Sequence, residues 1–304
     1  MSLRPADLRT DRVYARATLL NQGMHRRQLA SAAMTRVFPG WWMRADAQPA
    51  LSTLAEVFQH SIRPGAVISH ETAAELFGFP LPRAMTRQGG APLHCRGPES
   101  RGRASGGLVV VHRPAAAPTI RLDGITMSHP LVALQELAPR LAPVDLVVCL
   151  DALAADQNGT RERMRIPQIE QFLGTMSGRG VPALRRALPA VRERSWSPME
   201  TRLRLLLLSR GYPEPELNLK VCDPVTGTVY FIDLAYPDER IAIEYDGDEH
   251  RTNRQRWRDD LQRSAALQRM GWSLHRLTMA DYLRPGEVLA GLDHALREAR
   301  RNGR

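Results

Sequence analysis

The sequence predicts a multi-domain protein of the α/β class. Its 304 residues are more than one ordinary core accommodates. Short apolar runs of strand type alternate with stretches of helical periodicity, and the texture of the chain changes near residues 64, 155 and 194. We therefore expect four segments: a winged helix-turn-helix-like domain (1–64), a middle α/β domain (65–155), a helical linker (156–194) and a C-terminal α/β domain (195–304).

The balance of charge indicates a polyanionic partner. Lysine and arginine number 42 against 32 acidic residues, which gives a net charge of +10 and a pI near 10.4. This balance favours nucleic acid first and an anionic membrane second, with a basic surface that has no partner as the alternative. Only Lys220 among the basic residues is a lysine, a bias that a GC-rich bacterial coding sequence explains more simply than phosphate binding does.

Cysteine usage and hydropathy argue for the cytoplasm. The three cysteines, Cys95, Cys149 and Cys222, have neither the paired spacing of a zinc site nor an even number for disulfides. The first twenty residues carry charges throughout and lack the apolar core of a signal peptide. No stretch approaches the ~18 apolar residues of a membrane-spanning helix. We expect a cytoplasmic protein with no membrane segment.

The N-terminal segment has the element order of a winged helix. Residues 14–21 and 25–33 read as two short helices, and two β-prone runs follow around the turn Pro39-Gly40. A DNA-reading role would make basic residues of this segment nucleic-acid contacts, namely Arg26, Arg27 and Arg36. The alternative is a small helical cap in which the pair Trp41-Trp42 belongs to the core.

The middle segment shows no catalytic constellation. Its predicted elements are strands over 66–70 and 108–112 and helices over 71–77, 130–141 and 144–154. Its histidines lie on different elements, and lone histidines of this kind are more often structural than ligands; they are His70, His94, His112 and His129.

The C-terminal segment opens with a helix start that contains a candidate acid. Ser197 fits the N-cap, Pro198 the first helical position and Glu200 the third position of a capping box, and Gly211 ends the helix. Capping alone explains Glu200, so its role in an active site remains an open alternative.

A predicted hairpin brings acidic residues to one face of a sheet. Strands over 229–234 and 241–246 joined by a turn at Asp238-Glu239 pair Asp233 with Glu244. Strand alternation then separates an apolar face from an acidic one. The apolar face holds Ile232, Leu234, Ile241, Ile243 and Tyr245, and the acidic face holds Asp233, Glu244 and Asp246.

Paired carboxylates point to a metal ion. Two carboxylates opposite each other repel unless a cation compensates, and Mg²⁺ (or Mn²⁺) is commonly held by one or two carboxylates with waters and phosphate oxygens. We predict Asp233 and Glu244 as the metal ligands. The alternative, a solvated acidic face, fits less well because the neighbours on that face are Phe231, Ala235 and Ala242.

Residues that follow the hairpin add a proton-transfer group and basic side chains. His250 stands just beyond a glycine turn, where it could act as a general acid or base. A helix expected to bury Trp257, Leu261 and Ala265 would present an arginine-rich face to a phosphate backbone. The arginines predicted to bind nucleic acid there are Arg251, Arg254 and Arg258.

Together these motifs resemble the Vsr-like endonuclease domain, a branch of the PD-(D/E)xK restriction-endonuclease-like superfamily. The resemblance covers about 195–299 and rests on Ser-Pro-Met-Glu, Ile-Asp-Leu-Ala-Tyr-Pro, Ile-Glu-Tyr-Asp-Gly-Asp-Glu-His and Gly-Trp-Ser-Leu-His-Arg-Leu-Thr. It implies a mixed sheet flanked by helices, metal ligands at Asp233 and Glu244, and a site completed by Asp246 and His250. Asp246 stands where the superfamily expects lysine, and His250 is the natural substitute.

The resemblance implies a Mg²⁺-dependent endonuclease, with DNA as the favoured substrate and defence or repair as the context. Residues 1–155 resemble, more weakly, the winged-helix and following domains of AbiEi-type antitoxins of type IV toxin–antitoxin systems, which would imply a cognate toxin as partner. The alternative function is therefore a non-catalytic DNA-binding regulator or antitoxin whose nuclease-like domain is inactive.

Overall fold

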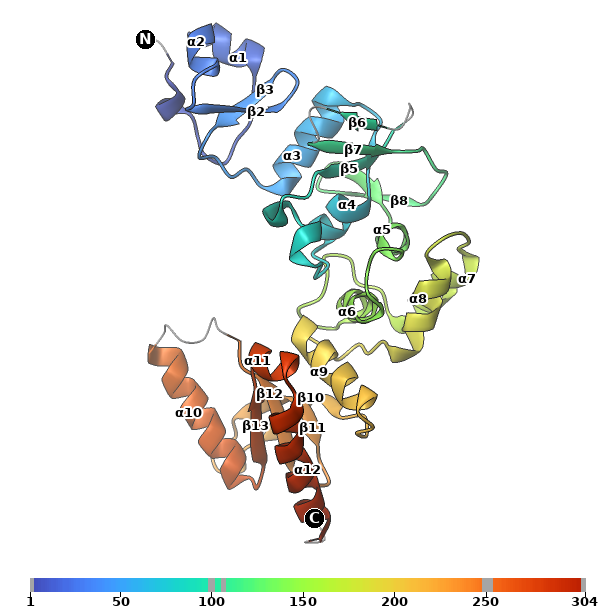
Figure 1. Ribbon diagram of the computed structural model, residues 1–304. Coiled ribbons are helices and arrows are strands. Elements are labelled where there is room, and N and C mark those ends of the chain that lie inside the picture. Colours follow the sequence, from blue (N-terminus) through green and yellow to red (C-terminus); the bar gives the residue numbers. More distant parts are fainter. Residues whose placement is uncertain (1–2, 98–101, 105–107, 248–253, 302–304) are drawn as a thin grey trace. The chain divides into compact units, whose positions relative to one another are not determined.

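The computed structural model describes residues 3–97, 102–104, 108–247 and 254–301. The described chain is a mixed α/β protein with three sheets (Figure 1). It divides into two compact units, the first made of 1–149 and 160–189 and the second of 150–159 and 190–304. No helix within these ranges combines the length and the apolar character needed to cross a membrane.

The N-terminal part of the first unit places two short helices before a tight hairpin. Its sheet has the antiparallel order β1-β3-β2, and Gly40, with φ +76°, forms the turn of the hairpin. A small core of leucines and methionines is covered in part by Trp42. The elements are β1 (Tyr14–Ala15), α1 (Arg16–Asn21), α2 (Arg26–Leu29), β2 (Met34–Phe38) and β3 (Trp41–Arg44). The DNA-reading role predicted for this part stays a prediction.

The rest of the first unit is built on a mixed sheet with the order β6-β7-β5-β4-β9-β8. Its strands are β4 (Val67–Ile68), β5 (Leu93–Arg96), β6 (Gly102–Ala104), β7 (Val109–His112), β8 (Thr119–Leu122) and β9 (Ile125–Ser128). Its helices are α3 (Leu51–Val57), α4 (His70–Phe77), α5 (Pro130–Leu137), α7 (Ile166–Thr175) and α8 (Val181–Ala187). The helix α6 (Pro143–Ala154) starts in this unit, and its residues from Leu150 on belong to the second. Apolar side chains of α7 and α8 are buried, so these segments are folded helices.

Three histidines that were expected to be isolated lie together in this unit. The rings of His70 and His112 stack with their centroids 3.5 Å apart, and His94 Nδ1 lies 2.9 Å from His112 Nε2. His94 Nδ1 also lies 3.1 Å from a carboxylate oxygen of the buried Glu71. Burial is the main cause that lowers the pKa of all three, to about 2 for His70 and about 4 for His94. Long-range pairing of β5 with β7 brings His94 and His112 together, which local sequence does not reveal.

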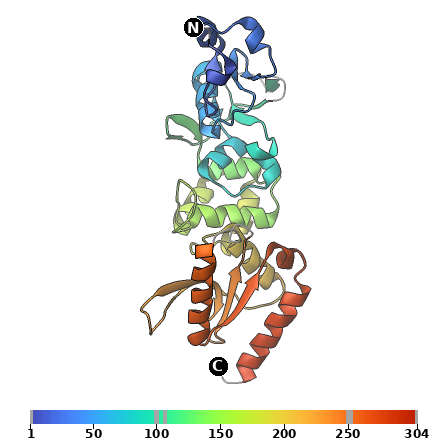
Figure 2. The same ribbon diagram turned by 90° about the vertical axis from the view of Figure 1, so that its left-hand side faces the viewer.

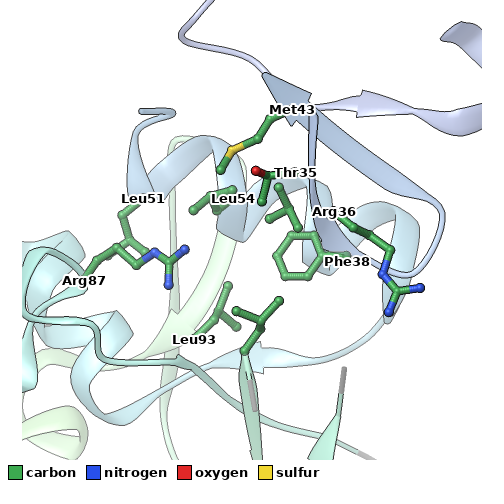
Figure 3. A pocket seen from close by; sticks show the side chains of 10 residues that line it. Thr35, Arg36, Phe38, Met43, Leu51, Leu54, Arg87 and Leu93 are labelled. Carbon is green, nitrogen blue, oxygen red and sulfur yellow. The ribbon is translucent and has the colours of Figure 1, made fainter. Parts of the chain in front are cut away.

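A small apolar cavity lies beside the hairpin of the first unit (Figure 3). Its volume is about 60 Å³, and Phe38, Leu54 and Leu93 are among the side chains that line it. The guanidinium of Arg36 is turned away from the other labelled side chains in this view. None of the described side chains that line the cavity is acidic.

The second unit contains a four-stranded sheet with the order β10-β11-β12-β13. Neighbouring strands are antiparallel except for β12 and β13, which are parallel because α10 connects them. Its helices are α9 (Pro198–Ser209), α10 (Arg254–Arg269), α11 (Met279–Leu283) and α12 (Gly286–Arg301). Its strands are β10 (Glu216–Cys222), β11 (Val229–Tyr236), β12 (Ile241–Tyr245) and β13 (Ser273–Leu277).

Each face of this sheet has its own core. Leucines of α9 and α12 pack on one face against Leu234 and Ile243. On the other face, Leu267 of α10 packs with Ile232 and Ala242. The two views show α10 on one side of the sheet and α12 on the other (Figures 1 and 2). Helices therefore cover both faces of the sheet, and its strands lie between them.

A buried ionic network anchors α9 within the second unit. Arg204 is fully buried and lies 3.1 Å from Asp151 Oδ2 and 3.2 Å from Glu214 Oε1. Thr201 donates its hydroxyl to the same Asp151 oxygen at 2.8 Å. A buried guanidinium needs such partners because an unpaired buried charge is strongly destabilising. The network holds the helix whose first turn carries Glu200.

Candidate active site

The register of β11 and β12 places Asp233 beside Glu244. The paired residues are Leu234 with Ile243, Ala235 with Ala242, and Tyr236 with Ile241. This is the pairing that the predicted turn requires. Asp233 and Glu244 are the next residues on the two strands, and the charge of Asp233 acts on Glu244. Asp233 Oδ2 accepts a hydrogen bond from the backbone N–H of Tyr245 at 3.0 Å.

The predicted apolar face was wrong for Ile232. Leu234 faces α9 and α12, whereas Ile232 packs on the opposite face with Ala235 and Ala242. In β10, opposite Asp233, the backbone of Asn218 adopts a left-handed conformation with φ +46°. Asparagine tolerates this conformation better than most residues. Leu217 and Leu219 on either side of it lie in different cores, so the alternation of both strands is broken at Asp233.

Glu200 is tied into the sheet as well as into its helix. Ser197 Oγ accepts the backbone N–H of Glu200 at 3.1 Å, as the predicted N-cap requires. The carboxylate, however, accepts the N–H of Trp196 at 2.8 Å and the side-chain amide of Asn218 at 2.6 Å. Capping therefore does not account for the position of Glu200, because its carboxylate also binds β10.

Burial raises the pKa values of three carboxylates, and the charge of Asp233 adds to the rise in two of them. The pKa of Glu200 rises to about 7, first because of burial and then because of the charge on Asp233. Burial raises the pKa of Asp233, although the Tyr245 N–H bond and Arg263 oppose the rise. The pKa of Glu244 rises to about 6 through burial, with Arg263 opposing and Asp233 adding to it. Groups shifted in this way by burial and by each other are typical of functional sites.

Arg263 is the basic side chain that reaches this cluster. Its Nη2 lies 2.5 Å from Glu244 Oε1 and also donates to the backbone carbonyl of Phe231. Arg276 stands opposite Glu244 in the parallel ladder and donates to Ser264 Oγ at 2.6 Å. Sequence reasoning missed Arg263 because it used a different helix phase. Leu261 and Ala265, expected to be buried, are exposed, and Ala266 and Leu267 are buried instead.

The remaining predicted residues fall in four groups. Asp246 is half-buried directly after β12, and its backbone N–H donates to the carbonyl of Leu277 at 2.8 Å. Arg254 and Arg258 belong to α10. His250 and Arg251 lie outside the described residues. The N-terminal arginines Arg26, Arg27 and Arg36 are all exposed in the first unit.

The residues present fit a cation held by few protein ligands. In the part of the chain that is described, no group of three or more histidines, cysteines or acids is arranged to hold a metal ion. Mg²⁺ needs less than this, because it commonly takes one or two carboxylates and keeps several waters. Glu244 Oε1 is buried and accepts no hydrogen bond of good geometry, although the charged Arg263 Nη2 lies 2.5 Å away.

Comparisons with known proteins agree with a nuclease-like fold for this region. The family model described as REase_MTES_1575, of the restriction-endonuclease-like type, matches residues 216–296. Two proteins of Mycobacterium tuberculosis are similar to the chain: "Uncharacterized protein MT2308" (strain CDC 1551 / Oshkosh) and "Uncharacterized protein Rv2248" (strain ATCC 25618 / H37Rv). Each is 30% identical over 240 residues, which cover 78% of this chain and 84% of the relative. No solved structure matches the chain.

Proposed function

The chain belongs to the family of these two mycobacterial proteins and ends in a restriction-endonuclease-like domain, and on this premise we propose that it is a Mg²⁺-dependent endonuclease that cleaves DNA. The observation that carries the proposal is the placement of Asp233 beside Glu244 in a buried sheet. Two buried carboxylates side by side destabilise a fold unless a cation or a proton compensates.

Asp233 and Glu244 would hold the divalent cation. When bound, the cation would polarise a phosphoryl oxygen and neutralise charge on the scissile phosphate. Glu200 keeps a proton near neutral pH because its pKa is about 7, so it is suited to exchange a proton with water or with the leaving oxygen. Asp246 and His250 keep their predicted roles in orienting or transferring a proton.

DNA binding would come from arginines. We propose that the DNA backbone is contacted by Arg254 and Arg258 of α10 and by Arg251. Further phosphate contacts would come from a winged-helix segment, through Arg26, Arg27 and Arg36. The exposure of these three side chains supports such contacts. The net charge of +10 is consistent with a polyanionic substrate.

The test is a cleavage assay with the full chain. Supercoiled, linear, mismatched and single-stranded DNA are each incubated with the protein in Mg²⁺, Mn²⁺ or EDTA. We expect cleavage of at least one substrate that depends on the metal and that Asp233→Asn abolishes. DNA binding without cleavage under every condition would instead support the regulator alternative, and cleavage that survives in EDTA would contradict the metal site.

A further inference from the structure

Arg263 occupies the charge position that a cation would take at Glu244. Its guanidinium lies 2.5 Å from Glu244 Oε1, and the Glu244 side chain is only 8% exposed. The same Nη2 also donates to the carbonyl of Phe231, the residue two before Asp233. Arg263 also opposes the rise in the pKa of both Asp233 and Glu244, so its charge acts on the pair.

A metal ion and Arg263 would compete for the same carboxylate. Each neutralises the charge that Glu244 and Asp233 share, and a guanidinium paired at 2.5 Å with Glu244 Oε1 blocks an oxygen that a cation needs. Releasing Arg263 without a new partner would leave a half-buried guanidinium (29% exposed) with its charge uncompensated. The exchange becomes favourable only if Arg263 gains another anion.

A phosphodiester is the anion that the site would receive. Guanidinium groups bind phosphate oxygens in bidentate fashion, through charge-assisted hydrogen bonds. Arg263 is long enough to serve two partners already, since it bonds both Glu244 and a main-chain carbonyl. The third position of the Glu-x-Lys pattern is Asp246 here, so the position directly after β12 supplies no positive charge.

We propose that Arg263 couples metal binding to substrate binding. Without substrate it pairs with Glu244 and holds the metal affinity down. When a DNA phosphate enters, the guanidinium transfers to the phosphate and frees Glu244 for the cation. This inference rests on the proposed function. Because coupling is reciprocal, phosphate raises the affinity for metal by the factor by which metal raises the affinity for phosphate.

The test measures metal binding, not cleavage. Free Mn²⁺ is followed by electron paramagnetic resonance during titration of the full chain. The titration is repeated with dimethyl phosphate, a phosphodiester that needs no target sequence, and with sodium chloride at the same ionic strength. We expect dimethyl phosphate to tighten Mn²⁺ binding by the wild type about fivefold or more, at the low end of typical coupling.

The variant Arg263→Gln separates competition from simple support of the fold. It should bind Mn²⁺ about tenfold more tightly than wild type without phosphate, and dimethyl phosphate should add nothing further. Arg263→Lys, which keeps the charge, should restore part of the coupling. Arg269→Gln is the matched control, because Arg269 lies on the same helix and pairs with Asp223 instead. Thermal melts establish that each variant is folded.

The outcomes are distinguishable. Equal Mn²⁺ affinity and equal phosphate response in wild type and Arg263→Gln would overturn the role of Arg263 and leave the metal site standing. Weaker Mn²⁺ binding by a folded Arg263→Gln would also overturn it, since Arg263 would then support the site. Absence of Mn²⁺ binding in wild type, Arg263→Gln and Arg269→Gln alike would overturn the metal site and this inference together.

Discussion

Asn218 donates its side-chain amide to Glu200 Oε2 at 2.6 Å and to the carbonyl of Arg194 at 2.7 Å. One residue of β10 thus joins the first turn of α9 to the segment that precedes it. The same residue carries the left-handed backbone opposite Asp233. Asn218 therefore binds the carboxylate of Glu200 and marks the break in alternation next to Asp233.

The first prediction concerns the metal carboxylates. Asp233→Asn and Glu244→Gln should each abolish cleavage, because each removes one of two charged ligands. Without metal, Asp233→Asn should unfold within about 1 kcal/mol of wild type or be more stable, since a repelling charge is removed while the amide keeps a hydrogen-bond acceptor. Glu244→Gln should be less stable than Asp233→Asn, because it also removes the charged partner of Arg263. Nicking assays and denaturant unfolding in EDTA measure both effects. A large loss of stability in Asp233→Asn would show that this carboxylate serves the fold.

The second prediction concerns Glu200. Its pKa of about 7 in the folded state lies above the ordinary value of 4.5, so the folded protein retains a proton that the unfolded chain loses. The contribution of Glu200 to metal-free stability should fall as pH rises from about 5 to 7. Relative to wild type, Glu200→Gln should gain about 2 kcal/mol over this interval. Urea unfolding in EDTA at several pH values measures the difference, and the exposed Glu216→Gln is the control, for which no such gain is expected.

The third prediction concerns the histidine cluster. The pKa values of His70 and His94 are lowered in the fold from 6.5 to about 2 and about 4. Below about pH 6.5 the unfolded chain therefore binds protons that the folded chain does not bind. Stability from this source is full above about pH 6.5 and is lost as pH falls toward 4. Each histidine contributes a slope of up to about 1.4 kcal/mol per pH unit, and the raised pKa of Glu136 offsets part of it.

Unfolding at pH 7.5 and 5.0 checks this slope. His94→Gln should flatten the pH dependence, because the amide can replace a hydrogen bond without titrating near neutral pH. His60→Gln, at an exposed position of the same unit, should leave the dependence as it is. Equal slopes in all three proteins would mean that the cluster does not resist protonation.

The fourth prediction concerns the N-terminal arginines. If Arg26, Arg27 and Arg36 contact phosphates, replacing all three by glutamine should weaken DNA binding and flatten its dependence on salt. The logarithmic slope changes by roughly 0.9 for each lost contact. Fluorescence anisotropy at several salt concentrations measures it. Arg9→Gln is the control because Arg9 already pairs with Asp11 at 2.6 Å. An unchanged slope would exclude these arginines from the DNA interface.

Local patterns were enough to predict the hairpin but not its surroundings. The spacing of Asp233 and Glu244 about a short turn defined their register, because strand pairing advances one residue on each side. The face of Ile232 could not be predicted in the same way, since it depends on the left-handed conformation of Asn218 in a neighbouring strand.

Long-range packing explains the other differences. The phase of α10 depends on which of its residues contact the sheet. Leu267 is buried against Ile232 and Trp272, whereas Leu261 is exposed. The position of Arg263 next to Glu244 depends on the same helix phase, so the sequence alone did not predict it. His94 and His112 belong to strands separated in sequence, and nothing in either strand alone indicates that their rings meet.

The network around Arg204 has a consequence for where the nuclease-like portion can be excised. Asp151, a partner of Arg204, lies in residues 150–159, which belong to the second unit. Residues 160–189 belong to the first unit, and the second unit resumes at residue 190. A recombinant fragment that starts at Ser195 would contain the whole four-stranded sheet. It would lack Asp151, so the buried guanidinium of Arg204 would lose that partner. A nick between 160 and 189 would leave both partners present. The smallest autonomous portion is thus discontinuous in sequence, and a practical truncation should begin ahead of Asp151.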